Sequence, residues 1–309
     1  MISHALILTA GFGMRLRPLT NERAKPAMPV AGDPLIRRIV AGLTTHGVTE
    51  LVMNLHHRPE TLTAVVGDAS DLGARLRYSW EQPRLLGSAG GPRKALPLLD
   101  AETFFLVNGD TLTDVSLAAL EAAHVGSNAR VTLALVPNRD FERYGGVEVD
   151  GRRRVNGFTR KGPASRNTWH FVGVQVVSAS VFDSLPEGEP LDTIGGVYDA
   201  LIRDRPGSVH AFCTDARFWD IGTASDYLRT AQAFSAFSRG GSDVGHRAKI
   251  DPSARVTGSI LWDDVEVGAN ASLDACIAAD GVRVPPGAAY RHSILIQHED
   301  ELAVTPFDP

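Results

Sequence analysis

Two cations follow a glycine turn near the start of the chain. The apolar segment Ala5 to Leu8 leads into Gly11 and Gly13, and Arg15 and Lys25 come after this turn. Glycines let a backbone approach a ligand closely, so that free N–H groups can point at phosphate oxygens. Arginine adds a planar fork of donors, and lysine adds a point charge. The residue types and their order therefore predict a site for a polyphosphate.

Two other phosphate-binding patterns fit this turn poorly. A dinucleotide-binding fingerprint needs a third glycine where this chain has Leu16, and an acidic residue after the second strand where it has Asn54. The phosphate loop of NTPases needs a Gly-Lys-Ser/Thr sequence, which does not follow the turn. A Rossmann oxidoreductase is therefore disfavoured, and a lack of nicotinamide binding would exclude it.

The remaining pattern, G-x-G-x-R-L-x-P-L-T with K-P further on, resembles the opening of the sugar-1-phosphate nucleotidylyltransferases, the enzymes that make NDP-sugars. The positions that match this opening are Gly11, Gly13, Arg15, Leu16, Pro18, Lys25 and Pro26. The positions that depart from it are Thr9, Ala10, Met14 and Ala24.

The resemblance assigns roles to this first segment. It implies that Ala10, Gly11 and Gly13 contact the nucleotide. It also implies that Arg15 meets the leaving β- and γ-phosphates and that Lys25 meets the α-phosphate region. A sugar 1-phosphate is already an anion, so its oxygen can attack the α-phosphorus without an activated Ser, Cys or His. The protein must then align two mutually repelling anions and neutralise the charge that grows during transfer.

Two aspartates are the candidate metal ligands. Asp110 follows the apolar segment Thr103 to Val107, at the strand end where ligands bind in an open α/β sheet, although a lone aspartate there could equally be a turn or cap residue. Asp220 lies in the sequence FWDIGT. The family carries an aspartate in each of two such motifs, and the resemblance implies that Asp110 and Asp220 hold Mg²⁺. This ion needs few carboxylates because phosphate oxygens and water complete its shell.

The loop EQPRLLGSAG, residues 81–90, resembles the family's base-binding loop. The resemblance implies that the Gln82 amide pairs with a base edge and that Gly87 and Ser88 contact the nucleotide. Ser88 keeps a hydroxyl where the family usually has threonine. A glycine-rich surface loop without a ligand remains the alternative.

The sugar side resembles the family less closely. Gly146 ends a Tyr-Gly-Gly sequence that resembles the family's Y-G-V segment at the sugar pocket. Lys161 matches the lysine of an E-K-P motif that binds the sugar phosphate, but Arg160 replaces the acid. Trp169 stands where the family more often has an N-x-G segment. These departures leave the identity of the sugar open.

Composition limits the class of protein. The chain has 309 residues, 43% of them hydrophobic, and a net charge of −5, which is ordinary for a globular protein and argues against nucleic acid as a partner. We expect a cytoplasmic protein without a membrane partner, since there is no secretory segment and no run of 18 apolar residues. Cys213 and Cys276 are expected to be ordinary core residues.

Strand-like and helix-like segments alternate through the first half, which predicts an α/β fold with a Rossmann-like, mostly parallel mixed sheet. Asp33 is expected to cap a helix that has Pro34 at its first position and stops at Gly47. The expected strands are residues 5–8, 50–54, 75–80, 103–107, 130–136, 147–149, 155–159, 171–177 and 209–212. The expected helices are residues 33–46, 59–66, 117–124, 194–203 and 224–237.

The last part of the chain has a different spacing of apolar residues. We expect a boundary that divides a catalytic domain, residues 1–239, from a tail, residues 240–309. Apolar residues recur near every sixth position in the tail, which predicts a short left-handed hexapeptide-repeat β-helix with an imperfect period and few coils. The expected inward residues are Ile250, Val256, Val267, Leu273, Val282 and Val284. A capping role, or homo-oligomerisation through the tail, is favoured over an acyltransferase site.

The motifs occur in the family's order over residues 5–237. They predict an Mg²⁺-dependent enzyme that joins an NTP and a sugar 1-phosphate into an NDP-sugar and pyrophosphate. The tail and the G-S-A-G loop favour GTP with mannose 1-phosphate, and UTP with an amino sugar 1-phosphate such as N-acetylmuramate 1-phosphate is the close alternative. A regulatory, sugar-nucleotide-binding chain without turnover is the alternative from another class. Intact Arg15, Lys25, Asp110 and Asp220 argue against it.

Overall fold

The structure is a computed structural model that describes residues 1–234 and 241–308. Its internal contacts divide the chain into two compact units. The first unit comprises Met1–Gly11, Ile39–His57 and Val66–Phe218. The second comprises Phe12–Arg38, Arg58–Val65 and Trp219–Pro309. Each unit therefore combines segments that are far apart in the sequence. The domain boundary predicted after residue 239 lies outside the described residues.

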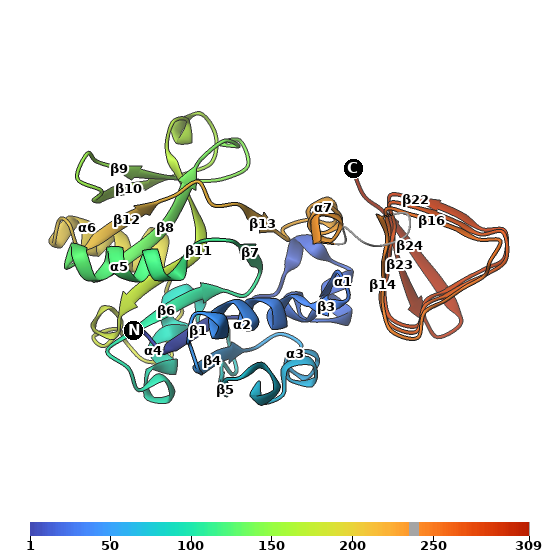
Figure 1. Ribbon diagram of the computed structural model, residues 1–309, viewed down its shortest axis with the longest axis horizontal. Helices are drawn as coiled ribbons and strands as arrows, with labels where there is room; N and C mark the ends of the chain where they lie inside the picture. Colours follow the sequence, from blue (N-terminus) through green and yellow to red (C-terminus); the bar gives the residue numbers. More distant parts are fainter. Residues whose placement is uncertain (235–240, 309) are drawn as a thin grey trace. The chain divides into compact units, whose positions relative to one another are not determined.

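A mixed, mostly parallel sheet of nine strands forms the first unit (Figure 1). The order β10-β9-β11-β6-β1-β4-β5 is extended by β8, which pairs with β11, and by β12, which pairs with β8. Strands β5, β4, β1 and β6 are mutually parallel. The strand bounds are β1 His4–Leu8, β4 Glu50–Leu55, β5 Arg75–Trp80, β6 Thr103–Asn108, β8 Val131–Pro137, β9 Gly146–Val149, β10 Val155–Thr159, β11 Trp169–Ser178 and β12 Val209–Cys213. The predicted fold class is confirmed.

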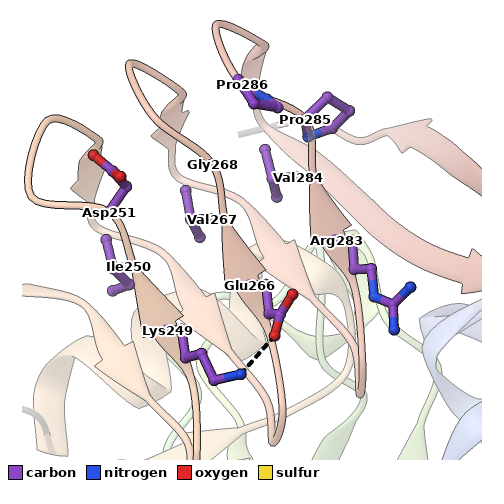
Figure 2. A pocket seen from close by; sticks show the side chains of 10 residues that line it. All are labelled: Lys249, Ile250, Asp251, Glu266, Val267, Gly268, Arg283, Val284, Pro285 and Pro286. Carbon is purple, nitrogen blue, oxygen red and sulfur yellow. Dashed lines mark hydrogen bonds and ion pairs between the residues drawn. The ribbon is translucent and has the colours of Figure 1, made fainter.

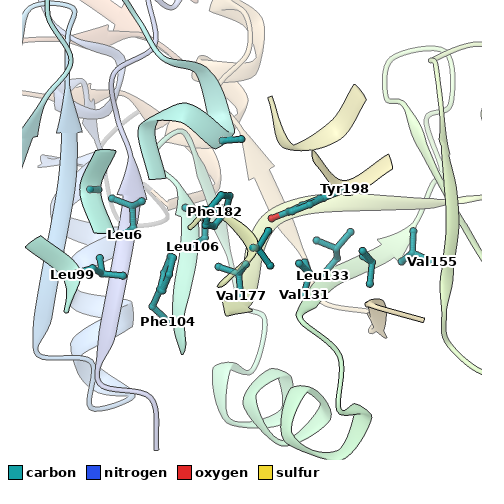
Figure 3. Packing of buried hydrophobic residues seen from close by; sticks show 14 of the residues in the cluster. Leu6, Leu99, Phe104, Leu106, Val131, Leu133, Val155, Val177, Phe182 and Tyr198 are labelled. Carbon is teal, nitrogen blue, oxygen red and sulfur yellow. The ribbon is translucent and has the colours of Figure 1, made fainter. Parts of the chain in front are cut away.

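Helices and apolar strands enclose the core of this unit. The central parallel strands are nearly continuous apolar runs, as expected for strands buried on both faces. Leu6, Phe104, Leu106, Val177 and Tyr198 pack together in this core (Figure 3). The helices that the unit contributes in whole or in part are α2 Leu35–Thr45, α4 Gly87–Leu99, α5 Leu117–Ser127 and α6 Tyr198–Asp204. Ser116 caps α5, since its hydroxyl accepts from the Ala119 amide at 3.2 Å.

The second unit begins with short elements. They are η1 Met14–Leu16, α1 Leu19–Glu22, η2 Lys25–Ala27, β2 Pro29–Val30 and β3 Asp33–Pro34. Helix α3, Pro59–Val66, and helix α7, Ala224–Phe234, belong to it almost entirely. The described part of α7 ends at Phe234, and the last predicted residues of this helix lie outside the described residues.

Three stacks of parallel strands build a solenoid in the second unit, and Figure 1 shows its coils as triangles. The register advances by 17 residues from coil to coil, as in Lys249↔Glu266↔Arg283 (Figure 2). The stacks are β14 Asp243–Val244, β17 Ile260–Leu261, β20 Ile277–Ala278 and β23 Ser293–His298; β15 Lys249–Ile250, β18 Glu266–Val267 and β21 Arg283–Val284; and β16 Arg255–Thr257, β19 Ser272–Asp274 and β22 Ala289–Arg291. Strand β24, Glu301–Pro306, pairs antiparallel with β23. The prediction of a β-helix-like tail is confirmed, and its handedness stays a prediction.

The imperfect six-residue period has a physical cause. A coil of 17 residues cannot hold three equal hexapeptides, so one side of each triangle is shorter. Val267, Leu273 and Val284 point into the solenoid core as expected. Ile250 is 38% exposed, because its strand is the first of its stack and has a neighbouring coil on one side only.

Three local predictions were wrong. Asp33 and Pro34 form β3, which pairs antiparallel with β2, and α2 starts only at Leu35. Residues 87–99 form helix α4, although this segment reads as a glycine-rich loop and contains two prolines. The predicted helix from residue 194 starts later, since Ile194 is extended and Gly195 has a φ of 82°.

Candidate active site

Four predicted residues of the first unit follow the carboxyl ends of parallel strands. Ala10 and Gly11 follow β1, Gln82 follows β5, and Asp110 follows β6. The ends of β1 and β6 are joined, since the Gly109 amide donates to the Leu8 carbonyl at 2.9 Å. In sheets of this kind the carboxyl edge is where ligands bind. The topology thus brings these residues to one edge of one sheet.

A buried polar pair supports two of the loops at this edge. The Asn54 side-chain oxygen accepts from the Thr9 amide at 2.7 Å, and its nitrogen donates to Oε1 of Glu81 at 2.7 Å. The other Glu81 oxygen accepts from the Leu86 amide at 2.7 Å. Glu81 is fully buried. The pair therefore connects the backbone before the glycine turn to the backbone of the loop at residues 81–86.

The start of α4 is packed against a second segment of the same unit. A Cβ placed on Gly87, which has a φ of 74°, would lie 2.6 Å from the Leu191 carbonyl oxygen. The Ser88 hydroxyl accepts from the Thr193 amide at 2.9 Å, and it donates to the Asp192 carboxylate at 3.2 Å. That carboxylate also accepts from the Ser88 amide, which satisfies a free donor at the helix start. Gly87 and Ser88 thus pack against residues 191–193, and Gln82 is exposed.

The predicted sugar-side residues gather around the β9–β10 hairpin. Gly146 pairs with the end of β10, and Trp169, at the start of β11, pairs with Val147 in β9. A Cβ on Gly146 would lie 2.2 Å from the Thr168 hydroxyl oxygen, so only glycine fits there. Lys161 is exposed beyond the end of β10.

An aromatic cluster lies beside this hairpin. The His170 ring is 4.2 Å from the Tyr144 ring and 5.0 Å from the Phe218 ring, centroid to centroid. Burial lowers the pKa of His170 to about 4, and the positive charge of Arg143 also lowers it. A hydrogen bond to the Gly145 backbone acts in the opposite direction and raises this pKa. The imidazole is therefore neutral at physiological pH.

The glycine turn continues into the second unit. Gly13 has a φ of 59°, in the left-handed region, and its carbonyl accepts from the Thr20 hydroxyl at 3.1 Å. A Cβ on Gly13 would lie 2.7 Å from the Thr20 methyl and 3.5 Å from Cβ of Lys25. Lys25 is only 8% exposed. Glycine is thus needed here both for its conformation and for the close approach of the Lys25 segment.

Arg15 and Asp220 converge on Gly222 in the same unit. A Cβ placed on Gly222 would lie 2.8 Å from Oδ2 of Asp220 and 3.3 Å from Nη1 of Arg15. Asp220 ends strand β13, Phe218–Asp220, and helix α7 starts four residues later. The absence of a side chain at Gly222 leaves room for a carboxylate beside a guanidinium.

The predicted set is thus divided between the two units. Gly13, Arg15, Lys25 and Asp220 belong to the second unit, and the other predicted site residues belong to the first. Within residues 1–234 and 241–308, no group of three or more His, Cys, Asp or Glu side chains could hold a metal ion. Asp110 and Asp220 offer the carboxylate oxygens that Mg²⁺ prefers, and this ion needs only one or two of them.

Sequence reasoning missed the buried pair. From the sequence, Asn54 is only the wrong residue for a dinucleotide fingerprint, and Glu81 is only one position of a loop motif. A polar residue at the end of an otherwise apolar strand was the available signal, because a buried amide needs partners.

The fold of this chain is shared with a solved structure. A solved structure described as a putative glucose-1-phosphate thymidylyltransferase from Bacillus anthracis, in complex with a sucrose, has the same fold, with a TM-score of 0.67 and 18% identity over 76% of this chain and 96% of that one. The nucleotidyl transferase family model matches residues 4–236. The chain belongs to the nucleotidyl transferase family and is an enzyme of that class, which confirms the family predicted from the motifs.

Two curated relatives carry more specific names. A mannose-1-phosphate guanylyltransferase of Mycobacterium tuberculosis is 31% identical over 92% of this chain and 81% of its own length. An N-acetylmuramate alpha-1-phosphate uridylyltransferase of Neisseria meningitidis is 36% identical over 60% of this chain and 79% of its own length. Among the described residues, no helix is long and apolar enough to cross a membrane.

Proposed function

We propose that this chain transfers a guanylyl group from GTP to mannose 1-phosphate, with release of pyrophosphate. The single observation that carries this choice is the extent of the similarity to the mycobacterial guanylyltransferase. Residues 1–242 make up less than four fifths of the chain, so a match over 92% of it includes part of the solenoid. The proposed substrates thus come from a relative whose sequence similarity extends into the tail.

A second candidate has its own support. The N-acetylmuramate alpha-1-phosphate uridylyltransferase has the higher identity, 36%, over a shorter part of the chain. On this alternative the substrates are UTP and an amino sugar 1-phosphate. The two candidates differ in base and sugar but share one reaction.

In that reaction, one phosphate oxygen of the sugar 1-phosphate forms a bond to the α-phosphorus of the NTP. The bond from the α-phosphorus to the oxygen that bridges to the β-phosphorus breaks, and pyrophosphate leaves with its charge. No protein nucleophile takes part. Arg15 would hold the leaving phosphates through its planar fork, and Lys25, which is largely buried, would hold the α-phosphate as a point charge. Both act by orientation and by stabilising charge in the transition state.

Asp110 and Asp220 would hold Mg²⁺. The bound ion would neutralise part of the negative phosphate charge, in addition to what Arg15 and Lys25 neutralise. Gly222 supports this assignment from the second unit, because its missing side chain gives the Asp220 carboxylate space beside Arg15. Asp110 supports it from the first unit by its place at the carboxyl end of β6.

The remaining predicted residues would bind the two substrates. Ala10, Gly11 and Gly13 would face the nucleotide with their backbone, and the exposed Gln82 amide would pair with the base. Gly87 and Ser88 would shape the base loop. Gly146, Lys161 and Trp169 would form the sugar-phosphate side. We place the enzyme in the cytoplasm, where NTPs are available, and keep residues 1–239 and 240–309 as its proposed catalytic and tail domains.

Pyrophosphate release with Mg²⁺ tests the proposal. The purified chain is assayed with each of four NTPs against mannose, glucose, N-acetylglucosamine and N-acetylmuramate 1-phosphates. Turnover restricted to GTP and mannose 1-phosphate is the expected result, and turnover restricted to UTP and the muramate substrate selects the second candidate. A folded chain that binds NTP but releases no pyrophosphate with any pair would refute both and favour a phosphate substrate that is missing from the panel. Loss of release in EDTA, with recovery on adding Mg²⁺, tests the metal.

A further inference from the structure

Arg23 attaches the segment between the two predicted phosphate cations to the solenoid. This residue lies between Arg15 and Lys25 in the sequence. Its Nε donates to Asp280 at 2.7 Å, and its Nη2 donates to Asp280 at 2.6 Å and to Asp263 at 2.7 Å. The guanidinium also lies 5.1 Å from the centre of the Trp262 ring. All these partners belong to the same compact unit as the segment itself.

The two aspartates need this arginine. Asp263 and Asp280 occupy the same corner of successive coils, 17 residues apart, where their carboxylates would otherwise repel each other. Burial raises the pKa of Asp280, and the nearby Asp263 raises it further, while Arg23 lowers it. Arg23 is only 15% exposed at its side chain. The arginine is thus largely buried while the Asp280 side chain is 41% exposed, and the contact is a charge-assisted fork in which one guanidinium binds two carboxylates.

A second connection runs through the buried Trp262. Its indole N–H donates to the Tyr227 hydroxyl at 3.0 Å, and that hydroxyl donates to the Pro29 carbonyl. Trp262 and Tyr227 are both fully buried. Tyr227 lies on α7, shortly after Asp220 in the sequence. One chain of hydrogen bonds thus joins the solenoid, helix α7 and the segment that follows Lys25.

Two more contacts fasten the solenoid to the same parts. Gln232 of α7 donates to the Gly258 carbonyl at 3.2 Å. Burial raises the pKa of Asp243, at the start of the first coil, and hydrogen bonds at the Ala31 and Gly32 backbone oppose that rise. The solenoid therefore contacts the chain both before Lys25, at Arg23, and after it, at residues 31–32. It also contacts helix α7, which follows Asp220.

We propose that the solenoid is a positioning element of the phosphate-binding site and that Arg23 is its key positioning residue. The solenoid holds residues 23–32 in place and thereby sets where Lys25 presents its charge. This inference rests on the proposed function for the assignment of Arg15 and Lys25 to the NTP. By linkage, NTP that orders this segment must strengthen the attachment of the solenoid by the same factor.

The full chain, Arg23→Ala and Arg23→Lys are compared by steady-state kinetics. We expect Arg23→Ala to raise KM for the NTP by about tenfold or more, which corresponds to 1.4 kcal/mol of binding. KM for the sugar 1-phosphate should change by less than about twofold, because residues 23–32 are proposed to contact the NTP and not the sugar 1-phosphate. Lysine should rescue only part of the effect, since a point charge cannot bridge two carboxylates as a fork does.

Arg247→Ala is the matched control. Arg247 also makes a fork, with Asp264 at 2.6 Å, but both partners belong to successive coils of the solenoid. Its removal should leave KM for the NTP unchanged. Asp280→Asn is a milder second variant that keeps the side-chain shape, and it should raise KM for the NTP less than Arg23→Ala does. It serves as the test if Arg23→Ala does not fold.

A measurement without turnover separates this proposal from the proposed function. Backbone amides of residues 24–32, such as those of Ala27 and Met28, are followed by hydrogen exchange without nucleotide. Faster exchange there in Arg23→Ala, but not in Arg247→Ala, would support the attachment even if the wild type released no pyrophosphate. A folded Arg23→Ala or Asp280→Asn protein with wild-type exchange and wild-type KM for the NTP would overturn it, as would equal effects of Arg247→Ala.

Discussion

The isosteric change Asn54→Asp tests the buried pair at the sheet edge. The Asn54 nitrogen lies 2.7 Å from Oε1 of Glu81, and the substitution puts a second oxygen at that distance. Two charged oxygens this close would repel by about 6 kcal/mol even at an effective dielectric of about 20. Binding one proton between them costs less. From an ordinary carboxyl pKa of about 4.3, holding that proton at pH 7 costs about 4 kcal/mol.

The sign of the pH dependence follows from this proton. Above about pH 4.5, the folded variant would bind one proton more than the unfolded chain, so its free energy of unfolding should fall by about 1.4 kcal/mol per pH unit relative to wild type. The loss should be about 1 kcal/mol at pH 5 and close to 4 kcal/mol at pH 7. Urea unfolding at pH 5, 6, 7 and 8 measures it.

Two controls make the result interpretable. Asn156→Asp introduces the same charge at an exposed position and should change stability little at any pH. Asn54→Leu removes the partner of the Thr9 amide and of Glu81, and it should destabilise the chain by an amount that varies much less with pH. A loss for Asn54→Asp that is the same at pH 5 and pH 8 would refute the reasoning.

Three further results are expected. Asp110→Ala and Asp220→Ala should each abolish pyrophosphate release in folded protein through loss of the metal, and near-normal turnover of either would contradict the assignment. Gly222→Ala should leave thermal stability nearly unchanged but raise the Mg²⁺ concentration needed for half-maximal release, because the added Cβ would lie 2.8 Å from Oδ2 of Asp220 and displace it from its place beside Arg15. The folded chain should lose up to about 3 kcal/mol of stability as the pH falls from 6.5 towards 4, because the unfolded His170 takes up a proton before the folded one, and His170→Phe should remove this loss in urea titrations at pH 4.5 and 7.

Local pattern predicts the strands and helices whose signals are strong. Strand β5 and helix α3 have their predicted bounds because a β-rich run and a proline at the first helical position mark them. Helix α4 could not be predicted in this way. Its Gly90 and Gly91 are there for close packing, since a Cβ on them would lie 2.3 Å from the Glu189 carbonyl oxygen and 2.5 Å from Oε1 of Glu81. Tertiary contacts of this kind outweigh the low helix propensity of glycine.

Motifs predict the residues of the candidate site, but they do not predict the residues that hold those residues in place. Asp110 and Gln82 can be placed at the sheet edge by reading where each strand ends. The partners of Arg23 cannot, because Asp263 and Asp280 follow it by 240 and 257 residues and nothing in the local sequence marks them. The same holds for Ser88, whose hydroxyl is engaged by Thr193, 105 residues further on. Long-range polar pairs are set by the fold and leave no periodic signal.

Because each coil of the solenoid has 17 residues, the lengths of insertions and deletions that the solenoid can accept are restricted. All three stacks share the advance, so adding or removing one whole coil keeps every inward residue inward. A change of three residues would break the spacing between inward positions and turn core residues out. Because Asp263 and Asp280 lie on the second and third coils, coils added after the third would leave the Arg23 attachment intact. Length differences among related tails should therefore come in steps of 17 residues, added after the coil that carries Asp280.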